Sequence, residues 1–491
     1  MNVPKIKISL TLTEETCQST RNLVSDFVSR FSKSEKFIER ADLAFATVFE
    51  MFIQNNKGFE VPSEIGFDVG IEDGKLKFNF INKGMPVYHG DEWSLSKTDQ
   101  INNSQFKKLV KLVDEHDTQN MGRTGQCLTL SFDIESEKDR APAFYQPDTS
   151  DEEASFEIRQ LKDGEEPELS RLFFKVYGYN YINETVYYPS RVKELIALKD
   201  LESWVAVDKK GKIIGHVGLL RHHRKPQVFE AALGLTDPNV KSRGLFSKIF
   251  EKVINEVGQK EMAFCVYDFV TNLIYSQKLV ARYGSCDMAL NIGCQVSETQ
   301  AQLGRLGLGQ DPEGMDRYSI LLGIHPGVKH PLGERVTLPV SLGALAEFIL
   351  EPLNITWMPS PRFFPMMREG SFTRNLQPTQ KAVSYIFHEP GQKALSAIIT
   401  DWKNLLRSGY QYASVDMPLD KAGIGQLHDI LSASGFFIAG FVPFQFTPRL
   451  GFRFQSIGPT KVAFDKIQVF SESAIKLKNL IQEDYERNVL I

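Results

Sequence analysis

Alternating apolar and polar positions divide the first 134 residues into short strands and amphipathic helices. Residues 5–13, KIKISLTLT, read as a strand, and alternation recurs at 65–70 and 76–82. Between them, residues 17–31 and 41–54 carry apolar side chains at the spacing of a helix with one buried face. The pattern predicts an α+β module.

The same reading extends along the rest of the chain. The middle part begins with a strand, FEIRQL, and continues into the hairpin WVAVDKKGKIIGHVGLL, whose Lys-Lys-Gly turn separates two apolar runs. Strands at 228–236 and 262–267 flank a helical pattern at 245–258. The last part offers RVTLPVS, a helical run from Leu342, YASVDMPL, a helix at 423–434 and GFFIAGFVPF. Because this ending repeats that of the middle part, we expect a weak internal duplication.

Two polar, turn-rich stretches, at 135–155 and 325–334, mark expected boundaries. We therefore predict three domains, at 1–145, 155–328 and 333–491, in an α+β fold with mixed sheets. A length of 491 residues is sufficient for about three domains.

The composition of the chain limits the kinds of partner that we expect it to bind. The net charge of −4 gives no excess of one sign, so we expect neither nucleic acid nor membrane to be bound. Five scattered cysteines without a Cys-x-x-Cys pair favour a reducing compartment over disulfides or a zinc site, and we expect no metal. The polar start and the lack of a run of about 18 apolar residues lead us to expect a cytoplasmic protein.

Candidate chemistry begins at the corner LTDPNVKSRGLFSKIF, residues 235–250. A glycine turn that enters a helix presents free backbone N–H groups and the positive end of the helix dipole, which can hold a diphosphate. Residues 241–247 have this form. An ordinary loop before a helix would read the same way, so the turn alone leaves both interpretations open.

Residues 155–328 resemble the GNAT acyltransferase superfamily. Its pyrophosphate loop reads Gln/Arg-x-x-Gly-x-Gly/Ala, and Lys241-Ser242-Arg243-Gly244-Leu245-Phe246 takes these positions. The stretches RLFFKVYGYNYINETVYYP, FEAALGLTDP and TNLIYSQKLVARYG carry the remaining likeness. The resemblance implies acetyl-CoA as co-substrate, held between two splayed parallel strands. The coenzyme-binding residues that it implies are Leu235, Thr236, Lys241, Ser242, Arg243, Gly244, Leu245, Phe246, Ser247, Ser276 and Gln277.

The same resemblance implies direct transfer from a thioester to an amine. Such an amine must lose a proton first, and Glu230 is the predicted base, the alternative being a solvated carboxylate at a strand edge. Main-chain N–H groups near Leu235 would polarise the thioester oxygen. Val280 stands where the family places a tyrosine that protonates the thiolate. Tyr275 and Tyr283 lie close in the sequence, and of these Tyr283 is the predicted acid.

Residues 5–133 resemble the histidine-kinase-type ATPase fold of anti-sigma-factor kinases. Thr47 and Met51 align with that family's catalytic Glu-x-x-x-Asn, and Asn82-Lys83-Gly84 with its Asp-x-Gly. The sequence Gly122-Arg123-Thr124-Gly125 is similar to a nucleotide lid loop. The resemblance implies a degenerate regulatory or structural α/β sandwich that contacts a protein partner, with ATP binding as an open alternative.

Residues 333–491 resemble a second GNAT-like half, as in a bacterial fusion of these modules. The half has YASVDMPL and GFF but no phosphate loop, so we predict that it packs against the active half without catalysis. The favoured hypothesis is an N-acyltransferase that acts on a small-molecule or protein amine. The alternative is a non-catalytic regulator that binds ligands or proteins through both kinds of module.

Overall fold

The computed structural model divides the chain into two compact units. The first comprises Met1–Leu198, Ser203–His216 and Leu235–Ile249, and the second Lys199–Glu202, Val217–Gly234 and Phe250–Ile491. This division passes through the predicted middle domain. The structure describes residues 5–57, 64–72, 74–86, 97–134, 156–209, 211–224, 227–238, 240, 244–258, 262–297, 317–326, 335–359, 366–419, 424–447, 449–459 and 462–489.

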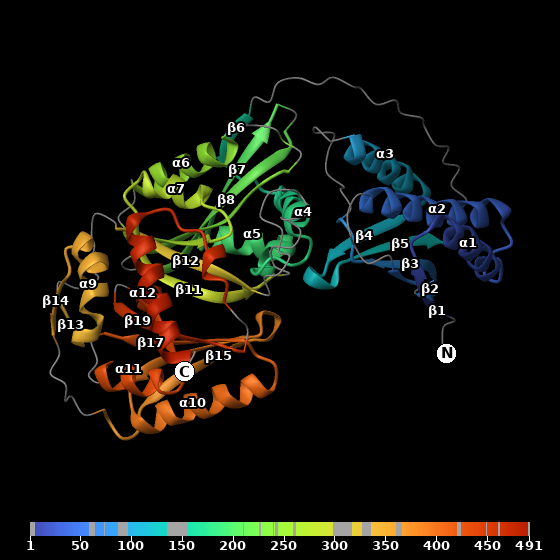
Figure 1. The fold of residues 1–491 in the computed structure, drawn as a ribbon. Coiled ribbons are helices and arrows are strands. Elements are labelled where there is room, and N and C mark those ends of the chain that lie inside the picture. The colour runs from blue at the N-terminus through green and yellow to red at the C-terminus, as the bar shows by residue number, and fades with distance from the viewer. Residues whose placement is uncertain are drawn as a thin grey trace. The chain divides into compact units, whose positions relative to one another are not determined.

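The first unit opens with a five-stranded antiparallel sheet covered by helices on one face (Figure 1). Its strand order is β1-β2-β3-β5-β4. The elements are β1 (Lys5–Thr11), α1 (Glu14–Ser29), α2 (Glu35–Asn56), β2 (Glu64–Glu72), β3 (Lys75–Asn82), α3 (Lys97–Leu112), β4 (Glu115–Asn120) and β5 (Gln126–Asp133). The strands and helices predicted between residues 5 and 82 are confirmed.

Strict alternation along β3 explains why only one face of this sheet is covered. Every second residue of the strand is buried, including Phe78 and Phe80. The ring of Phe80 packs 5.7 Å from that of Phe45 and 6.3 Å from that of Phe52, both on α2. Fully burying one such side chain contributes about 2 kcal/mol. The amphipathic helix and the alternating strand therefore form one phenylalanine-rich core.

The remainder of the first unit contains α4 (Glu166–Tyr177), α5 (Pro189–Ala197) and most of β7 (Leu201–Asp208). Strand β6 (Phe156–Gln160) pairs antiparallel with β7, with Ile158 opposite Ala206. Each of the helices α4 and α5 has a proline in its first turn. Proline suits this position because the N–H groups of the first turn have no acceptor within the helix, so the missing N–H costs no hydrogen bond.

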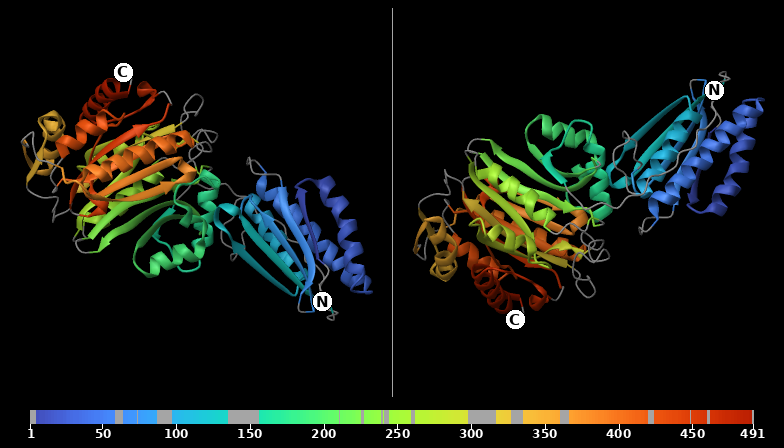
Figure 2. Two further views of the ribbon diagram at one scale, coloured as in Figure 1. Left: turned by 90° about the horizontal axis from the view of Figure 1, so that it is seen from below. Right: turned by 90° about the horizontal axis from the view of Figure 1, so that it is seen from above.

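The second unit is built on a mixed sheet with the strand order β15-β16-β17-β19-β18-β11-β12-β10-β9-β8. Helix α12 (Glu472–Val489) covers its central strands β18 and β11, as the views in Figure 2 show. The strands are β8 (Ile213–Arg224), β9 (Gln227–Thr236), β10 (Met262–Val270), β11 (Cys286–Val296), β12 (Arg317–Pro326), β15 (Ser371–Gln377), β16 (Ala382–Glu389), β17 (Tyr412–Pro418), β18 (Phe437–Pro443) and β19 (Leu450–Ile457). A separate parallel pair joins β13 (Arg335–Leu338) and β14 (Thr356–Pro359).

One topology occurs twice in the C-terminal two thirds of the chain. The order β9-β10-β12-β11 reappears as β16-β17-β19-β18, and the first pair is parallel in both. The intervening helices correspond as well: α6 (Leu245–Gly258) and α7 (Tyr275–Ala281) in the first copy, α10 (Gln392–Arg407) and α11 (Ile424–Ser432) in the second. The topology therefore agrees with the expected internal duplication.

The two copies meet where β11 pairs with β18 through Ala289 and Gly440. Gly440 has φ 131°, and a Cβ there would lie 2.3 Å from the carbonyl oxygen of Met288. The buried Gln455 joins the strands further, since its Nε2 donates to the carbonyls of Leu290 and Ile438 at 3.0 Å each. Close backbone approach thus requires glycine at this junction.

Gly440→Ala is expected to lower the free energy of unfolding by about 1–3 kcal/mol, because the added methyl group must push β11 and β18 apart. Gly258→Ala is the matched control, since a Cβ there meets no atom within 4 Å. Urea unfolding of the two variants and the wild type measures the difference. An unchanged midpoint for Gly440→Ala would show that the junction is not tightly packed.

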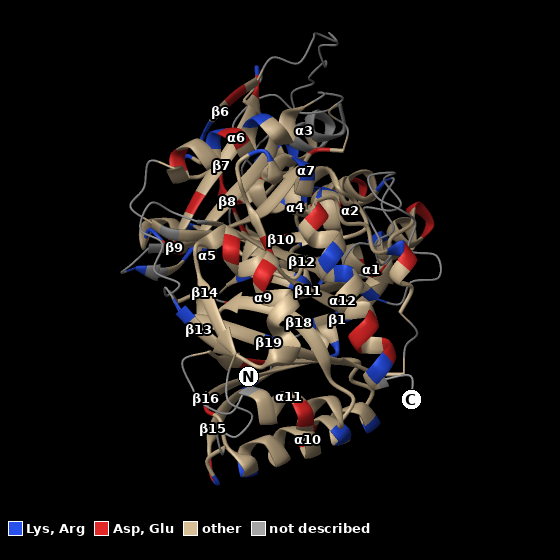
Figure 3. Ribbon diagram, turned by 60° about the vertical axis from the view of Figure 1, so that its left-hand side comes forward, with Lys and Arg blue, Asp and Glu red and all other residues tan. Residues whose placement is uncertain are grey.

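Two helices of the second unit differ in their balance of charge. Helix α10 has three basic residues and one acidic residue, whereas α12 has four acidic and three basic residues (Figure 3). Helix α12 therefore presents no single sign of charge to a partner.

Within the described part of the chain, no helix is both long enough and apolar enough to cross a membrane.

Candidate functional site

The candidate site of the second unit begins where a parallel strand pair stops. Strands β9 and β10 pair from Met262 opposite Gln227 to Val266 opposite Glu230. Both strands continue beyond this point, and β10 remains paired with β12 as far as Val270 opposite Ile320. The last pair of the β9–β10 ladder therefore places Glu230 at the point where the strands separate.

Strand β9 also changes direction just after Glu230. Leu233 is buried but has φ 57°, in the left-handed region that a non-glycine residue rarely adopts. This conformation costs about 1–2 kcal/mol and interrupts regular pairing. The predicted oxyanion donors near Leu235 follow this bend in the sequence.

Glu230 forms a close pair with a histidine from the neighbouring strand β8. Nε2 of His222 lies 2.6 Å from Oε2 of Glu230, and the two side chains are 28% and 16% exposed. The pair therefore remains accessible to a ligand. A carboxylate bonded to an imidazole can accept a proton from a bound group and pass it on.

Asp268 adds a second carboxyl group to the same face. It lies two residues beyond Val266 on β10, and because alternate residues of a strand share a face, it is on the side of Glu230. Asp268 is exposed to solvent. The surrounding protein, and next the Glu230 carboxylate, raise the pKa of Asp268 to about 7, while Arg453 and His222 act to lower it. The Asp268 carboxyl group is thus open to solvent, and the negative charge of Glu230 on the same face disfavours its ionised form.

The second copy of the topology carries an aspartate at the corresponding place. Asp416 lies two residues before the end of β17, as Asp268 does on β10. Opposite Asp416 stands Arg453, whereas Leu322 stands opposite Asp268. Arg453 binds Asp416 through both oxygens, from Nε at 2.7 Å and Nη2 at 2.8 Å. This charge-assisted pair holds Asp416.

Arg453 also connects the two copies. Its Nη1 donates to Oδ1 of Asn291 on β11 at 3.1 Å, and its charge acts on Asp268. Asp416 is thus neutralised by a bidentate partner, while Asp268 interacts with Arg453 only electrostatically. The arrangement leaves one of the two aspartates ready to take and release protons near neutral pH.

The predicted coenzyme turn lies in the first unit. Lys241, Ser242 and Arg243 fall outside the described residues. Gly244 is exposed with φ 85° and precedes α6, whose Leu245 is buried and whose Ser247 is exposed. Phe246 is half-buried, Leu235 is buried and Thr236 is half-buried. Of the predicted turn, the structure therefore describes Gly244 and its entry into α6.

The two predicted residues on α7 have different surroundings. Ser276 is half-buried in its first turn. Gln277 is buried, and its Nε2 donates to the carbonyls of Val270 at 3.2 Å and Gln468 at 3.1 Å. Its Oε1 accepts the N–H of Phe470 at 3.0 Å. The amide of Gln277 is therefore engaged by the backbone.

Tyr283 lies near α6 rather than among the acidic residues. Burial and the adjacent Glu251 carboxylate raise the pKa of Tyr283, to which Glu251 is also hydrogen-bonded. Among the described contacts of Glu230, His222 and Asp268, none involves Tyr283. In the structure, Asp268 thus lies on the same face as Glu230, and Tyr283 lies elsewhere, beside Glu251.

The N-terminal positions that align with ATPase motifs are filled by packing residues. Thr47 and Met51 are buried on α2, and the Thr47 hydroxyl donates to the carbonyl of Leu43 at 2.7 Å. Asn82 is fully buried and accepts the N–H of Gly84 at 2.9 Å. The turn at Gly122–Thr124 places Arg123 Nη2 2.9 Å from the carbonyl of Tyr181. The Thr47, Asn82 and Arg123 side chains therefore form hydrogen bonds with the backbone of the protein itself.

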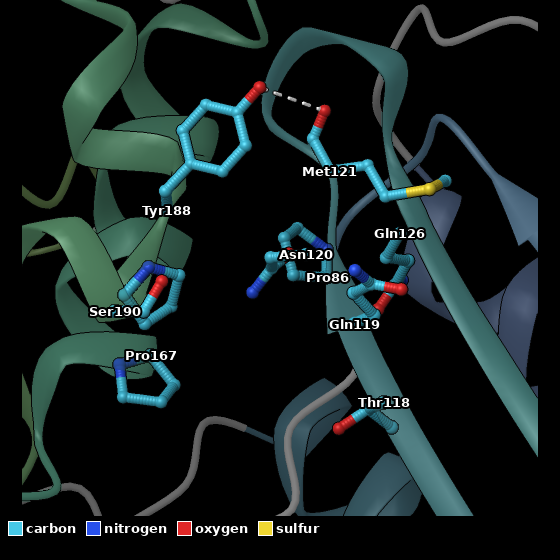
Figure 4. Close-up of a pocket in the computed structure, with 10 residues that line it drawn as sticks. Pro86, Thr118, Gln119, Asn120, Met121, Gln126, Pro167, Tyr188 and Ser190 are labelled. Carbon is cyan, nitrogen blue, oxygen red and sulfur yellow. Dashed lines mark hydrogen bonds between the residues drawn. The ribbon is translucent and has the colours of Figure 1, made fainter.

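A cavity of about 580 Å³ lies within the first unit, between β4 and the start of α5 (Figure 4). The hydroxyl of Tyr188 donates to the Met121 carbonyl at 3.2 Å beside it. No charged side chain is among its described lining residues, which are Pro86, Thr118, Gln119, Asn120, Met121, Gln126, Pro167, Tyr188, Pro189 and Ser190. The lining therefore offers hydrogen bonds but no strong acid or base.

The described residues contain no cluster of three or more His, Cys, Asp or Glu side chains arranged to hold a metal ion. The five cysteines are all free thiols.

Sequence reasoning proposed Glu230 as the base but did not single out His222, Asp268 or Arg453, which lie near it in the structure. The available signal was an aspartate inside an otherwise apolar strand, which occurs in both MAFCVYDFV and YASVDMP.

No protein-family model matches the chain, and no curated protein matches it. Among solved structures, it is similar to Arabidopsis thaliana NAA60 in complex with a bisubstrate analogue, with 10% identity, TM-score 0.28, and coverage of 36% of this chain and 99% of that chain. It is also similar to a ribosomal-protein-S5-alanine acetyltransferase from Vibrio fischeri, with 14% identity, TM-score 0.28, and coverage of 37% and 98%. A GNAT-family acetyltransferase from Streptococcus pneumoniae shows 13% identity, TM-score 0.28, and coverage of 35% and 99%.

Proposed function

We propose that the chain is an acyl-CoA-dependent N-acyltransferase, with acetyl-CoA as donor and a small-molecule or protein amine as acceptor. The observation that carries this proposal is the Glu230–His222 pair at the end of the β9–β10 ladder, with Asp268 on the same face. Direct transfer to an amine needs a base, oxyanion donors and correct positioning, and it needs no metal.

In the proposed reaction, the acyl group passes directly from the thioester to the amine. Glu230, supported by His222, takes a proton from the protonated amine. The free amine nitrogen attacks the thioester carbonyl carbon, and main-chain N–H groups near Leu235 stabilise the negative oxygen. The C–N bond forms, the attacking nitrogen loses its remaining extra proton, the C–S bond breaks, and the coenzyme thiolate takes up one proton and leaves as the free thiol. In this scheme Asp268 supplies a second group that titrates near neutral pH.

Tyr283 remains the predicted donor of the thiolate proton, and Lys241 to Ser247, with Ser276 and Gln277, the predicted coenzyme contacts. We propose that the N-terminal module is a degenerate, regulatory ATPase-like domain that contacts a protein partner. The packed Thr47, Met51 and Asn82 support a role without ATP turnover. We propose residues 1–145, 155–328 and 333–491 as the domains, the last as a second GNAT-like half.

Two measurements test this function. Calorimetry with acetyl-CoA reports binding, and release of free thiol over a panel of amines reports transfer. Binding followed by acceptor-dependent thiol release is expected. Binding without release for any amine would favour the alternative, a non-catalytic regulator.

Gly244→Asp is expected to weaken acetyl-CoA binding by about tenfold, because it sets a carboxylate against the diphosphate at the start of α6. Gly244→Asn is the matched control: Asp and Asn have nearly the same shape and both tolerate the left-handed backbone that φ 85° requires. No atom lies within 4 Å of a Cβ built there. Calorimetry compares the two variants, and equal affinities would contradict a diphosphate at this turn.

A further inference from the structure

The connection between β18 and β19 has an unfavourable backbone conformation. It contains the short turn Phe444–Phe446, in which Gln445 has φ 52° and Phe446 has φ 53°. Two successive non-glycine residues in the left-handed region are uncommon, and such conformations persist where surrounding contacts hold them. The turn thus has a shape that its own residues do not favour.

The contacts that hold this turn lie on either side of it. Phe444 is buried, and a Cβ built on Gly451 would lie 2.9 Å from its ring, which shows how closely the ring packs on β19. The Thr447 hydroxyl donates to the Phe444 carbonyl at 2.6 Å, and the Arg449 guanidinium lies 5.3 Å from the Phe444 ring centroid. Phe444 therefore anchors the turn and fixes where Phe446 projects.

Phe446 projects onto His222. The ring centroids are 3.9 Å apart and the planes differ by 14°, so the phenyl ring covers one face of the imidazole. The edge of the same imidazole is bound to Glu230 at 2.6 Å. A ring that is stacked on one face and hydrogen-bonded at one edge cannot rotate without losing both contacts. Two restraints, one from Phe446 in this turn and one from Glu230 on β9, therefore set the orientation of Nε2.

We infer that Phe446 is a positioning residue for the proposed acyl transfer, acting through His222, so that the C-terminal half completes the catalytic site. This inference rests on the proposed function. From the sequence we predicted only a packing role for that half. The inference instead explains why a buried phenylalanine and a strained turn present an aromatic ring to the Glu230–His222 pair.

The test combines kinetics with chemical modification of His222. Diethyl pyrocarbonate acylates accessible imidazole nitrogens, and fragment-ion sequencing of the modified peptide separates His222 from the adjacent His223 and gives the rate for His222 alone. In Phe446→Leu, which keeps an apolar side chain but loses the stacked ring, we expect His222 to react about fivefold faster. We expect kcat to fall about tenfold in the same variant, with little change in the KM for acetyl-CoA.

Phe446→Tyr retains the stacked ring and is expected to remain within about twofold of the wild type in both measurements. Ile475→Val changes an exposed apolar side chain on α12 of the same half and serves as control. Thermal melts show that each variant is folded. If Phe446→Leu matches the wild type in either the modification rate or kcat, the inference is wrong.

The two proposals can fail separately. A wild-type protein that transfers no acyl group to any amine would overturn the proposed function, because thiol release measures it directly. The modification rate needs neither acetyl-CoA nor turnover, so it still decides whether Phe446 holds His222. Equal modification in Phe446→Leu and wild type would overturn the positioning role even if transfer is observed.

Discussion

Glu230→Gln is expected to lower kcat by about 100-fold while acetyl-CoA binds within about twofold of the wild-type affinity. Glutamine preserves the shape and can still bond to Nε2 of His222, which lies 2.6 Å from the carboxylate, but it cannot take a proton. The loss should therefore appear in the chemical step. Thiol release at saturating amine gives kcat, and calorimetry gives the affinity for acetyl-CoA.

Asp200→Asn is the matched control for this variant. Asp200 pairs with Arg224 at 2.6 Å near the end of β8, the strand that carries His222, but it has no contact with Glu230. The exposed pair contributes little to stability, so the control should retain full kcat. An unaltered kcat in Glu230→Gln would remove this residue from the mechanism and leave Asp268 as the remaining carboxyl group on that face.

Local patterns were sufficient to predict much of the fold. The period of 3.6 residues in α2 and of two in β3 identified the N-terminal core, since one element's buried face must meet the other's. The strand pair β9 and β10 and helix α6 were also predicted close to their observed bounds. In each case a single apolar stripe along one segment carried the information.

The register of the strands, and the pairing of strands far apart in the sequence, could not be predicted from such local patterns. The role of Asp268 depends on which residue stands opposite it, and the contrast between Leu322 and Arg453 exists only once the strands are aligned. Shifting a strand by one residue would reverse every side chain. The position of Phe446 depends on a turn far along the chain from His222. Sequence patterns within one segment hold neither kind of information.

Exposure also limited the sequence reading of the second copy. Strand β15, which was not predicted, has one half-buried residue among exposed ones. Helix α10 was not predicted either, although its buried residues recur at helical spacing. An edge strand with little buried surface leaves a weak alternation of apolar and polar residues, because few of its side chains contact the core.

Asp268→Asn is expected to make the protein more stable at pH 8 and less active. Burial and the Glu230 carboxylate raise the pKa of Asp268 to about 7, above the value of about 3.9 for a free aspartate. Between these values the folded chain holds a proton that the unfolded chain has released, so the free energy of unfolding falls as pH rises. Asparagine removes this penalty. Because water reaches the carboxyl group, we expect a gain of about 1 kcal/mol at pH 8 and none near pH 4.

The more stable Asp268→Asn variant should have a lower kcat/KM. Wild-type kcat/KM for the amine is expected to rise through about pH 7 as Asp268 loses its proton, and the variant should lack that step and fall about tenfold at pH 8. Urea unfolding at pH 8 and pH 4, with kinetics over the same range, measures both effects in one variant. A stabilised variant with an unchanged pH profile would show that Asp268 is strained by its surroundings but takes no part in proton transfer. A site that is destabilised so that it can react must instead show both effects together, since the same raised pKa that weakens the fold above pH 7 brings the carboxyl group into its working range.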